Sequence, residues 1–318
     1  MNKPKRLTSI GGQAVIEGVM MRGPESIATS IRKSNGEIIV DKKPYKSFSQ
    51  RIKIFRFPIV RGVIAFFESM IMGMKSLMFS AEYFDLEVED PNYKPSKFEA
   101  FLNKLFGDKF QDVLIFFSLA LSLVLGVGLF VILPNAPANL LFGKNGILYH
   151  DSFMYNVVVG VVRLVVFFLY IVLISRMKDI QRVFEYHGAE HKTIHCFEHE
   201  ESLTVENVKK YSTLHPRCGT SFLLIVMVVS IAVFSFFLSE NFWITVSMHL
   251  ALLPLVAGLS YEIIKFAGRS QNKFVCLLNV PGMWMQRFTT REPDDSQIEV
   301  AIKALGSVVT DDKNADKW

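Results

Sequence analysis

The sequence is short of several features that a secreted or soluble protein would carry. It has only three cysteines, Cys196, Cys218 and Cys276, too few for the disulfide framework of a small secreted domain. Its first residues are basic, but no apolar run follows them, so we expect no cleavable signal peptide. Charged residues make up 20% of the chain, whereas half of its 318 residues are hydrophobic. This composition indicates an integral membrane protein.

Four apolar windows are long enough to cross a hydrocarbon core of about 30 Å, which takes roughly 20 helical residues. They are residues 113–133, 153–175, 221–238 and 242–264. We therefore expect a mainly α-helical polytopic membrane protein with about four transmembrane helices, embedded in the lipid bilayer of the cell membrane.

Lysine and arginine are scarce in two of the segments that connect these windows. Residues 1–111 hold 18 of the 35, and residues 176–219 hold seven, whereas residues 135–152 hold one and residues 239–241 hold none. Because cytoplasmic flanks keep positive charge, this pattern predicts that both termini lie in the cytosol. The net charge of +5 then follows from this asymmetry and from attraction to anionic lipid, and we expect no specific nucleic-acid binding.

The remaining segments divide the chain into four expected parts. Residues 1–58 form a cytosolic β-rich element, because β-branched residues alternate with turn signals there and Ser34-Asn35-Gly36 predicts a hairpin. Residues 59–111 form an interfacial or re-entrant helix and a linker. Residues 112–264 form the four-span domain, whose cytosolic loop 176–220 is rich in histidine, and residues 265–318 form a cytosolic tail.

The stretch 59–81 is apolar and long enough to span, but its charges argue against crossing. Arg61, Glu68 and Lys75 recur at heptad spacing and form one stripe on a helix. If this helix crossed, either the basic N-terminal residues would lie outside or every later loop would invert. We expect the helix to lie against the bundle with its stripe toward water or a protein partner. A channel or substrate groove lined by the stripe is the alternative.

Five of the seven histidines lie between residues 187 and 215. On a helix predicted over 179–200, residues four apart stay on one face. His187-x-x-Glu190-His191 has the H-x-x-E-H order of inverted zinc peptidases, in which two histidines bind metal and the glutamate is the general base. We expect His215 or Cys218, just before the third window, to supply a further ligand to zinc or another divalent metal.

Other residues are weaker candidate ligands: His195, Glu198 and Glu262. His187 and Glu198 would lie about 16 Å apart on a straight helix, so they cannot share one ion. The simpler interpretation of the His187/His191 pair is that interfacial histidines hydrogen-bond lipid headgroups or cap helix ends.

One ionisable residue, Arg163, falls near the middle of the second window. A charge at that depth costs about several kcal/mol unless it is paired or hydrated. We therefore expect the Arg163 side chain to face the interior of the bundle. Glu262 and Glu68 are the two candidate partners, and the sequence does not choose between them.

Three long motifs resemble those of the YqhQ-type bacterial membrane proteins, a family catalogued as predicted metal-dependent enzymes. The motifs are Gly11-Gly-Gln-Ala-Val-Ile-Glu17-Gly-Val-Met-Met-Arg22, His187-Gly-Ala-Glu-His-Lys192 and His215-Pro-Arg-Cys-Gly-Thr-Ser-Phe222. The resemblance covers nearly the whole chain. It implies a metal-dependent enzyme, and it adds Glu17 and Arg22 to the residues of interest.

Two functions from different classes follow as hypotheses. The first is a cytosol-facing metal-dependent hydrolase or protease, in which Glu190 activates water. The second is a non-enzymatic factor in membrane-protein biogenesis or quality control, which contacts a translocon, a ribosome or lipid and uses any metal only to hold the loop to the spans. A transporter that uses Arg163 and Glu262 has less support, because no paired broken helices are evident.

Overall fold

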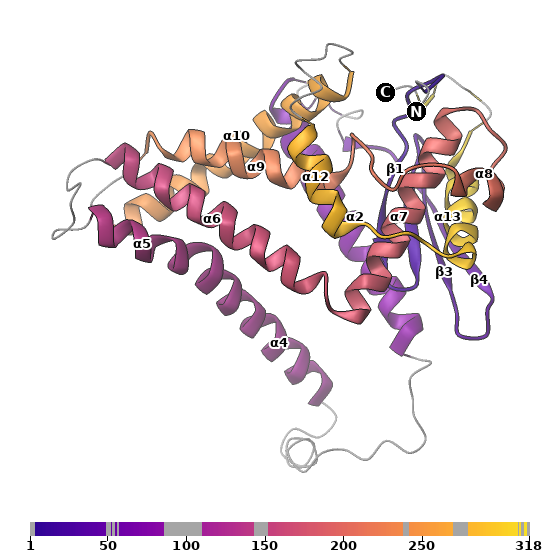
Figure 1. The fold of residues 1–318 in the computed structure, drawn as a ribbon, viewed down its shortest axis with the longest axis horizontal. Coiled ribbons are helices and arrows are strands. Elements are labelled where there is room, and N and C mark those ends of the chain that lie inside the picture. The colour runs from indigo at the N-terminus through magenta and orange to yellow at the C-terminus, as the bar shows by residue number, and fades with distance from the viewer. Residues whose placement is uncertain are drawn as a thin grey trace.

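A computed structural model describes residues 4–48, 52, 55, 57–85, 110–142, 152–237, 242–269, 279–310, 312 and 315–316. Its strands and its long apolar helices lie on opposite sides of the molecule (Figure 1). The sheet, with the helices that cover it, forms one end, and the helices that match the apolar windows extend away from it. A mainly helical membrane protein with a small N-terminal sheet is therefore confirmed.

The N-terminal strands form an antiparallel meander in the order β1-β2-β3-β4. Their bounds are β1 Gly11–Val15, β2 Gly18–Arg22, β3 Ser26–Arg32 and β4 Ile38–Pro44. The expected hairpin after β3 is confirmed, and Gly36 there has a φ of +85°, which glycine adopts without strain. The apolar stretch 14–22 is two strands rather than one, because the chain turns at Ile16 and Glu17.

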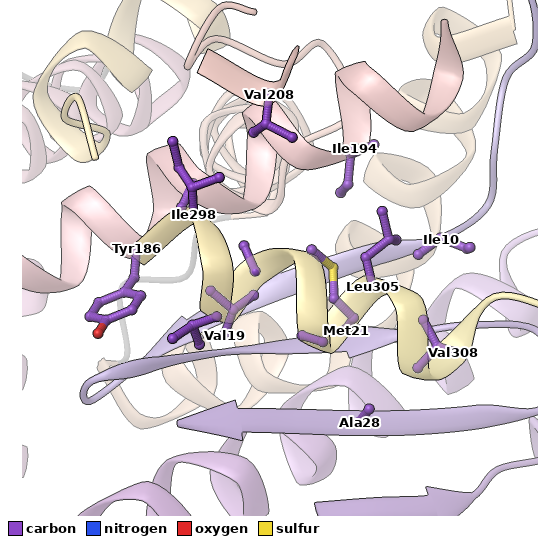
Figure 2. Close-up of a cluster of buried hydrophobic side chains, with 14 of the residues drawn as sticks. Ile10, Val19, Met21, Ala28, Tyr186, Ile194, Val208, Ile298, Leu305 and Val308 are labelled. Carbon is purple, nitrogen blue, oxygen red and sulfur yellow. The ribbon is translucent and has the colours of Figure 1, made fainter. Parts of the chain in front are cut away.

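Two helices, α7 (Lys178–Glu198) and α13 (Asp295–Val308), pack against the sheet and close a core of fully buried side chains. Figure 2 shows α13 laid over the strands with the side chain of Leu305 beside that of Met21. Apolar residues recur along α13 at helical spacing, and Asp294 with Gln297 forms a capping box at its start. The helical run expected at 298–305 is thus the middle of a core helix and not part of an extended tail.

The long helices on the other side are five α-helices and one π-helical turn. They are α4 (Phe110–Val127), η3 (Gly128–Ile132), α5 (Leu133–Phe142), α6 (Ser152–Ile174), α9 (Gly219–Phe234) and α10 (Phe242–Arg269). Shorter helices complete the described chain, namely α8 (Val205–Lys209) and α12 (Val280–Thr289), and α2 (Val60–Asp85) runs between the sheet and α10.

Among the described residues, four helices are long and apolar enough to cross a membrane: Val60–Tyr83, Ala120–Leu141, Phe153–Ile174 and Ser247–Gly268. This set differs from the expected one at two places. The third expected window corresponds to α9, which has 16 residues and is short of a full span. The stretch 60–83, expected not to cross, has the length and composition of a span, and its contacts are considered below.

The first expected span is also longer than its window, because helix continues through Pro134 and Pro137 to Phe142. Proline has no N–H, so Pro134 cannot donate the helical hydrogen bond to the Phe130 carbonyl four residues earlier. Arg163 Nε donates to that carbonyl instead, at 2.9 Å. The intramembrane arginine is therefore bound by a backbone carbonyl in the π-helical turn that precedes Pro134.

Neither carboxylate expected to pair with Arg163 does so. Glu262 forms an ion pair with Arg61, and Glu68 accepts a hydrogen bond from Tyr45. Both expected partners were wrong, because each carboxylate is bound by another residue of this chain. A pair between distant segments cannot be chosen from the sequence alone.

Candidate metal centre

The histidines of α7 form a row along one face of an unbroken helix. The ring centroids of His187 and His191 are 4.4 Å apart, and the His215 ring lies 5.5 Å from that of His191. Gly188 does not interrupt the helix. A Cβ at this position would overlap the backbone carbonyl oxygen of Arg291, so glycine permits the segment before α13 to pass close to α7.

His187, His191 and Cys218 bring one potential ligand atom each to a common point. These atoms all lie within 4.8 Å of one another, and His187 Nε2 is 3.2 Å from Cys218 Sγ. Cys218 is the N-cap residue of α9, where its sulfur accepts the backbone N–H of Thr220. The helix start therefore fixes the thiol against α7 and favours its negative charge.

Backbone carbonyls set the orientation of both imidazoles. His187 Nδ1 is 2.7 Å from the Thr289 carbonyl oxygen, and His191 Nδ1 contacts the Thr213 carbonyl oxygen in the same way. A carbonyl only accepts hydrogen bonds, so each Nδ1 carries a hydrogen, and Nε2 is the nitrogen through which each ring could bind a metal. Metal-binding histidines in proteins are held by outer partners of this kind.

Glu190 lies beside the same group and is only 4% exposed. Its Oε2 is 3.9 Å from His187 Nε2, and the carboxylate accepts a hydrogen bond from the Gly12 backbone. A Cβ on Gly12 would come within 3.1 Å of the Glu190 carboxyl carbon and 2.5 Å of the Met20 carbonyl oxygen. Gly12 is thus explained by the close approach of β1 to Glu190, whereas a Cβ at Gly11 would meet no atom within 4 Å.

The buried Cys218 thiol, Glu190 and His187 influence one another's pKa values, and together they favour a proton on His187. Burial disfavours the imidazolium of His187, but the Cys218 thiolate and Glu190 raise the pKa of His187 to about 9. Burial also disfavours the Cys218 thiolate, yet His187 and His191 hold the thiol pKa well below its usual range. Burial raises the pKa of Glu190, and the two histidines oppose this only in part. A cation between these donors would replace the shared proton.

A second group with metal-ligand chemistry lies next to the first and contains His195, Glu198 and His215. Glu198 is buried, pairs with the guanidinium of Arg217 and accepts the backbone N–H of Thr8 at 2.9 Å. Because Arg217 already supplies a positive charge, this group has the character of an internal ion pair. It ties the N-terminal segment to α7 and to the loop before α9.

The two residues expected as alternative ligands are therefore separated by the packing. Cys218 lies with His187 and His191, whereas His215 lies with His195 and Glu198. Burial, followed by the neighbouring histidines, lowers the pKa of His215 well below its usual value, so its ring is neutral.

The other residues of interest lie outside this cluster. Glu17 forms a bidentate ion pair with Arg182 of α7, and it also accepts a hydrogen bond from the hydroxyl of Tyr186. The Arg22 guanidinium lies 4.8 Å from the centre of the Tyr45 ring. Glu262 of α10 forms an ion pair with Arg61 at the start of α2. The sequence did not predict three backbone groups that bind the site residues: the carbonyls of residues 213 and 289 and the N–H of Gly12. A backbone partner can belong to any residue type, so residue patterns do not reveal it.

Comparisons with known proteins agree with the motifs. The model of a family described as "Protein of unknown function (DUF1385)" matches residues 57–311, which include all the histidines of the cluster. The "Uncharacterized protein YqhQ" of Bacillus subtilis (strain 168) is 34% identical over 317 residues, which cover 97% of this chain and 95% of that protein. No solved structure matches. The chain therefore belongs to the DUF1385 family, to which the YqhQ-type resemblance pointed.

Proposed function

We propose that this membrane protein is a metal-dependent hydrolase whose divalent ion is held by His187, His191 and Cys218. One observation carries the proposal: two Nε2 atoms, each oriented by a carbonyl on its Nδ1, converge on a thiolate within 4.8 Å. Two imidazoles and one thiolate form a ligand set that suits zinc, and a tetrahedral ion would keep a fourth position for a water or a substrate.

The protein groups would divide the chemistry in a simple way. A bound zinc ion would supply Lewis acidity at the carbonyl of the substrate. Glu190 would take a proton from the attacking water and return it to the leaving group, and its raised pKa suits that exchange near neutral pH. The substrate would be a peptide or ester presented at the membrane surface on the cytosolic side.

The placement of the termini supports a cytosolic site. The backbone N–H of Ser9 is bonded to the Asp316 carbonyl at 2.6 Å, and Arg6 pairs with the Asp316 carboxylate at 2.7 Å. We infer from these contacts that the segments around Ser9 and Asp316 lie on one side of the membrane, together with α7. The excess of lysine and arginine in these segments supports the cytosol as that side.

Replacing Glu190→Gln should remove hydrolysis and leave the metal. The amide keeps the size of the side chain but cannot accept the proton, and general-base catalysis contributes about 10²–10⁴-fold. The measurements are cleavage of fluorescence-quenched casein by the detergent-purified protein and zinc content by mass spectrometry. Cleavage by the native protein that persists after chelation would contradict a metal-dependent hydrolase. A Glu190→Gln protein that keeps full cleavage would remove Glu190 from the mechanism.

The runner-up function, a non-enzymatic biogenesis factor with a structural metal, is favoured by the low exposure of the cluster. His191 is 1% exposed, and the donors join α7, the start of α9 and the end of α12. Cobalt substitution separates the two functions, because an open coordination position binds added ligands. We expect acetohydroxamate to change the visible spectrum of the cobalt protein. An unchanged spectrum would support a closed structural site, with a translocon or ribosome as the partner to test.

Metal binding should release protons in a pH-dependent manner. At pH 7.5 the free His187 is protonated, because its pKa is about 9, whereas the Cys218 thiol is already ionised. Zinc must displace the His187 proton, so about one proton per zinc should be released at pH 7.5 and almost none well above pH 9. Calorimetric titration in buffers of different ionisation enthalpy measures this number. Release of two protons at pH 7.5 would show that the thiol is not ionised in the free protein.

A further inference from the structure

Helix α2 is attached at its N-terminal end to α10. Arg61 forms a bidentate ion pair with Glu262. The two helices also pack closely at Gly62, where a Cβ would lie 3.0 Å from the Cα of Gly258 and 2.7 Å from the side chain of Tyr261. This end of α2 is therefore fixed against residues 258–262 of α10.

The rest of α2 is attached to the sheet. Glu68 accepts a hydrogen bond from Tyr45 at 2.7 Å, just after β4, and Ser76 is 3.2 Å from Thr29 Oγ1 on β3. Near the end of the helix, Phe79 packs against the small buried cluster of the sheet, which contains Val15, Met20 and Ile31. Both halves of α2 thus contact elements that lie on the same side as α7 and α13.

Chain parity gives the same result independently. The sheet and α7 pack together, so the chain between β4 and α7 must cross the membrane an even number of times. Among the described residues this interval contains three long apolar segments: α2, the run from α4 to α5, and α6. The latter two extend away from the sheet as an adjacent pair (Figure 1). They supply one passage out and one back, so among the described residues α2 is not needed as a further crossing of the membrane.

The exposed side of α2 is apolar. Its exposed large hydrophobic residues are Val60, Phe66, Phe67, Met70, Ile71, Met74, Leu77 and Met78. At 3.6 residues per turn they fall within an arc of about 140°. Arg61 and Glu68 project to the opposite, protein-facing side, whereas Lys75 and Glu82 lie at one border of the arc. Two of the three members of the charged stripe, Arg61 and Glu68, therefore bind this chain and not water or a foreign partner as expected, whereas Lys75 is exposed.

We propose that α2 lies in the plane of the membrane, on the side of the sheet, with its apolar arc among the lipid acyl chains. The arc continues onto the spans, because Phe66 packs on Phe222 near the start of α9, with ring centroids 6.1 Å apart. Lys75 at the border can reach the headgroups. The candidate span in α2 has a mean hydropathy of 1.4, the lowest of the four and half the 3.0 of α6. In-plane helices of 20–30 residues have this character.

This placement would hold the histidine cluster at the membrane surface whether or not a metal is bound. Gly73 of α2 packs directly against Gln13 of β1, and the neighbouring Gly12 contacts Glu190. An α2 helix anchored in lipid therefore fixes the strand that reaches the cluster. A substrate or partner that moves within the membrane surface would therefore approach the histidine cluster most easily.

Spin-label depth measurements test the placement of α2. Met70→Cys and Met74→Cys, one turn apart on the arc, would be labelled in vesicles of phosphatidylethanolamine and phosphatidylglycerol, with signal from the native cysteines subtracted. Val165→Cys, on an exposed position of α6, gives the reference for a span. Labels at both α2 sites should be more accessible to oxygen than to a nickel chelate. Both should lie at the same shallow depth, about 5–10 Å below the headgroups.

Two results would overturn the proposal. A depth that changes by a full helical rise, about 6 Å between the two sites, would show that α2 crosses the membrane. Greater accessibility to the nickel chelate than to oxygen, or no accessibility to either, would show that water or a protein covers the arc instead of lipid. A folded state common to the variants and the native protein would be confirmed by equal thermal unfolding temperatures.

Discussion

Replacing His191→Ala should abolish stoichiometric metal binding, while His195→Ala should leave it intact. The two histidines are one turn apart on α7, but only His191 belongs to the donor group with His187 and Cys218. Loss of an outer partner of a metal-binding histidine already costs about 10–100-fold in affinity. Loss of the ligand itself should cost more, so zinc should fall from about one per chain to a small fraction.

The measurement is zinc content by mass spectrometry after chelation, reloading and gel filtration in detergent. Cys218→Ala should match His191→Ala, because both remove one donor from the same point. Equal loss of zinc in His195→Ala would mean that the ion is held by the group that contains Glu198 instead. A native protein that takes up no zinc would exclude the metal centre altogether.

Replacing Gly188→Ala should strongly destabilise the protein, although alanine is the better helix former. A Cβ at this position would overlap the carbonyl oxygen of Arg291, and the backbone N–H of Arg291 is bonded to Phe184 on the same helix, at 2.9 Å. The segment cannot move away without breaking that bond. Overpacking of this kind costs about 1–3 kcal/mol, so the unfolding temperature should fall by several degrees.

Gly306→Ala is the matched control for this substitution. Gly306 lies in α13, and no atom would come within 4 Å of its Cβ. Alanine there should increase stability by about 0.5–1 kcal/mol, since it restricts the unfolded chain and favours helix. Thermal unfolding followed by intrinsic fluorescence compares the two. The packing argument fails if Gly188→Ala unfolds within a degree of the native protein, or if Gly306→Ala is equally damaging.

The candidate site could be predicted from the sequence as far as one helix extends. Four-residue spacing places His187 and His191 one turn apart, and the same helical rise separates His187 from Glu198. The choice between His215 and Cys218 could not be made, because both lie in a segment without a repeating pattern. It depends on how α9 begins beside α7, and Cys218 reaches the group as the N-cap residue of α9.

The fold shows the same division between local and distant contacts. The Asn-Gly turn between β3 and β4 was predicted because two adjacent residues determine it. The role of α13 was not, since its apolar face is informative only when the sheet that it covers, almost 270 residues earlier, is known. Arg163 is a further case: Pro134 marks the free carbonyl of Phe130 in the sequence, but only packing brings the guanidinium to it.

By itself the sequence determined the membrane class, the hairpin, the histidine-bearing helix and the segregation of positive charge. Each of these follows from composition or from periodicity within a single element. Tertiary structure alone decided which donors meet, which side of α2 faces the protein, and that the segment before β1 is bonded to Asp316 near the other end of the described chain. These outcomes depend on contacts between elements far apart in the chain, where neither propensity nor spacing specifies a partner.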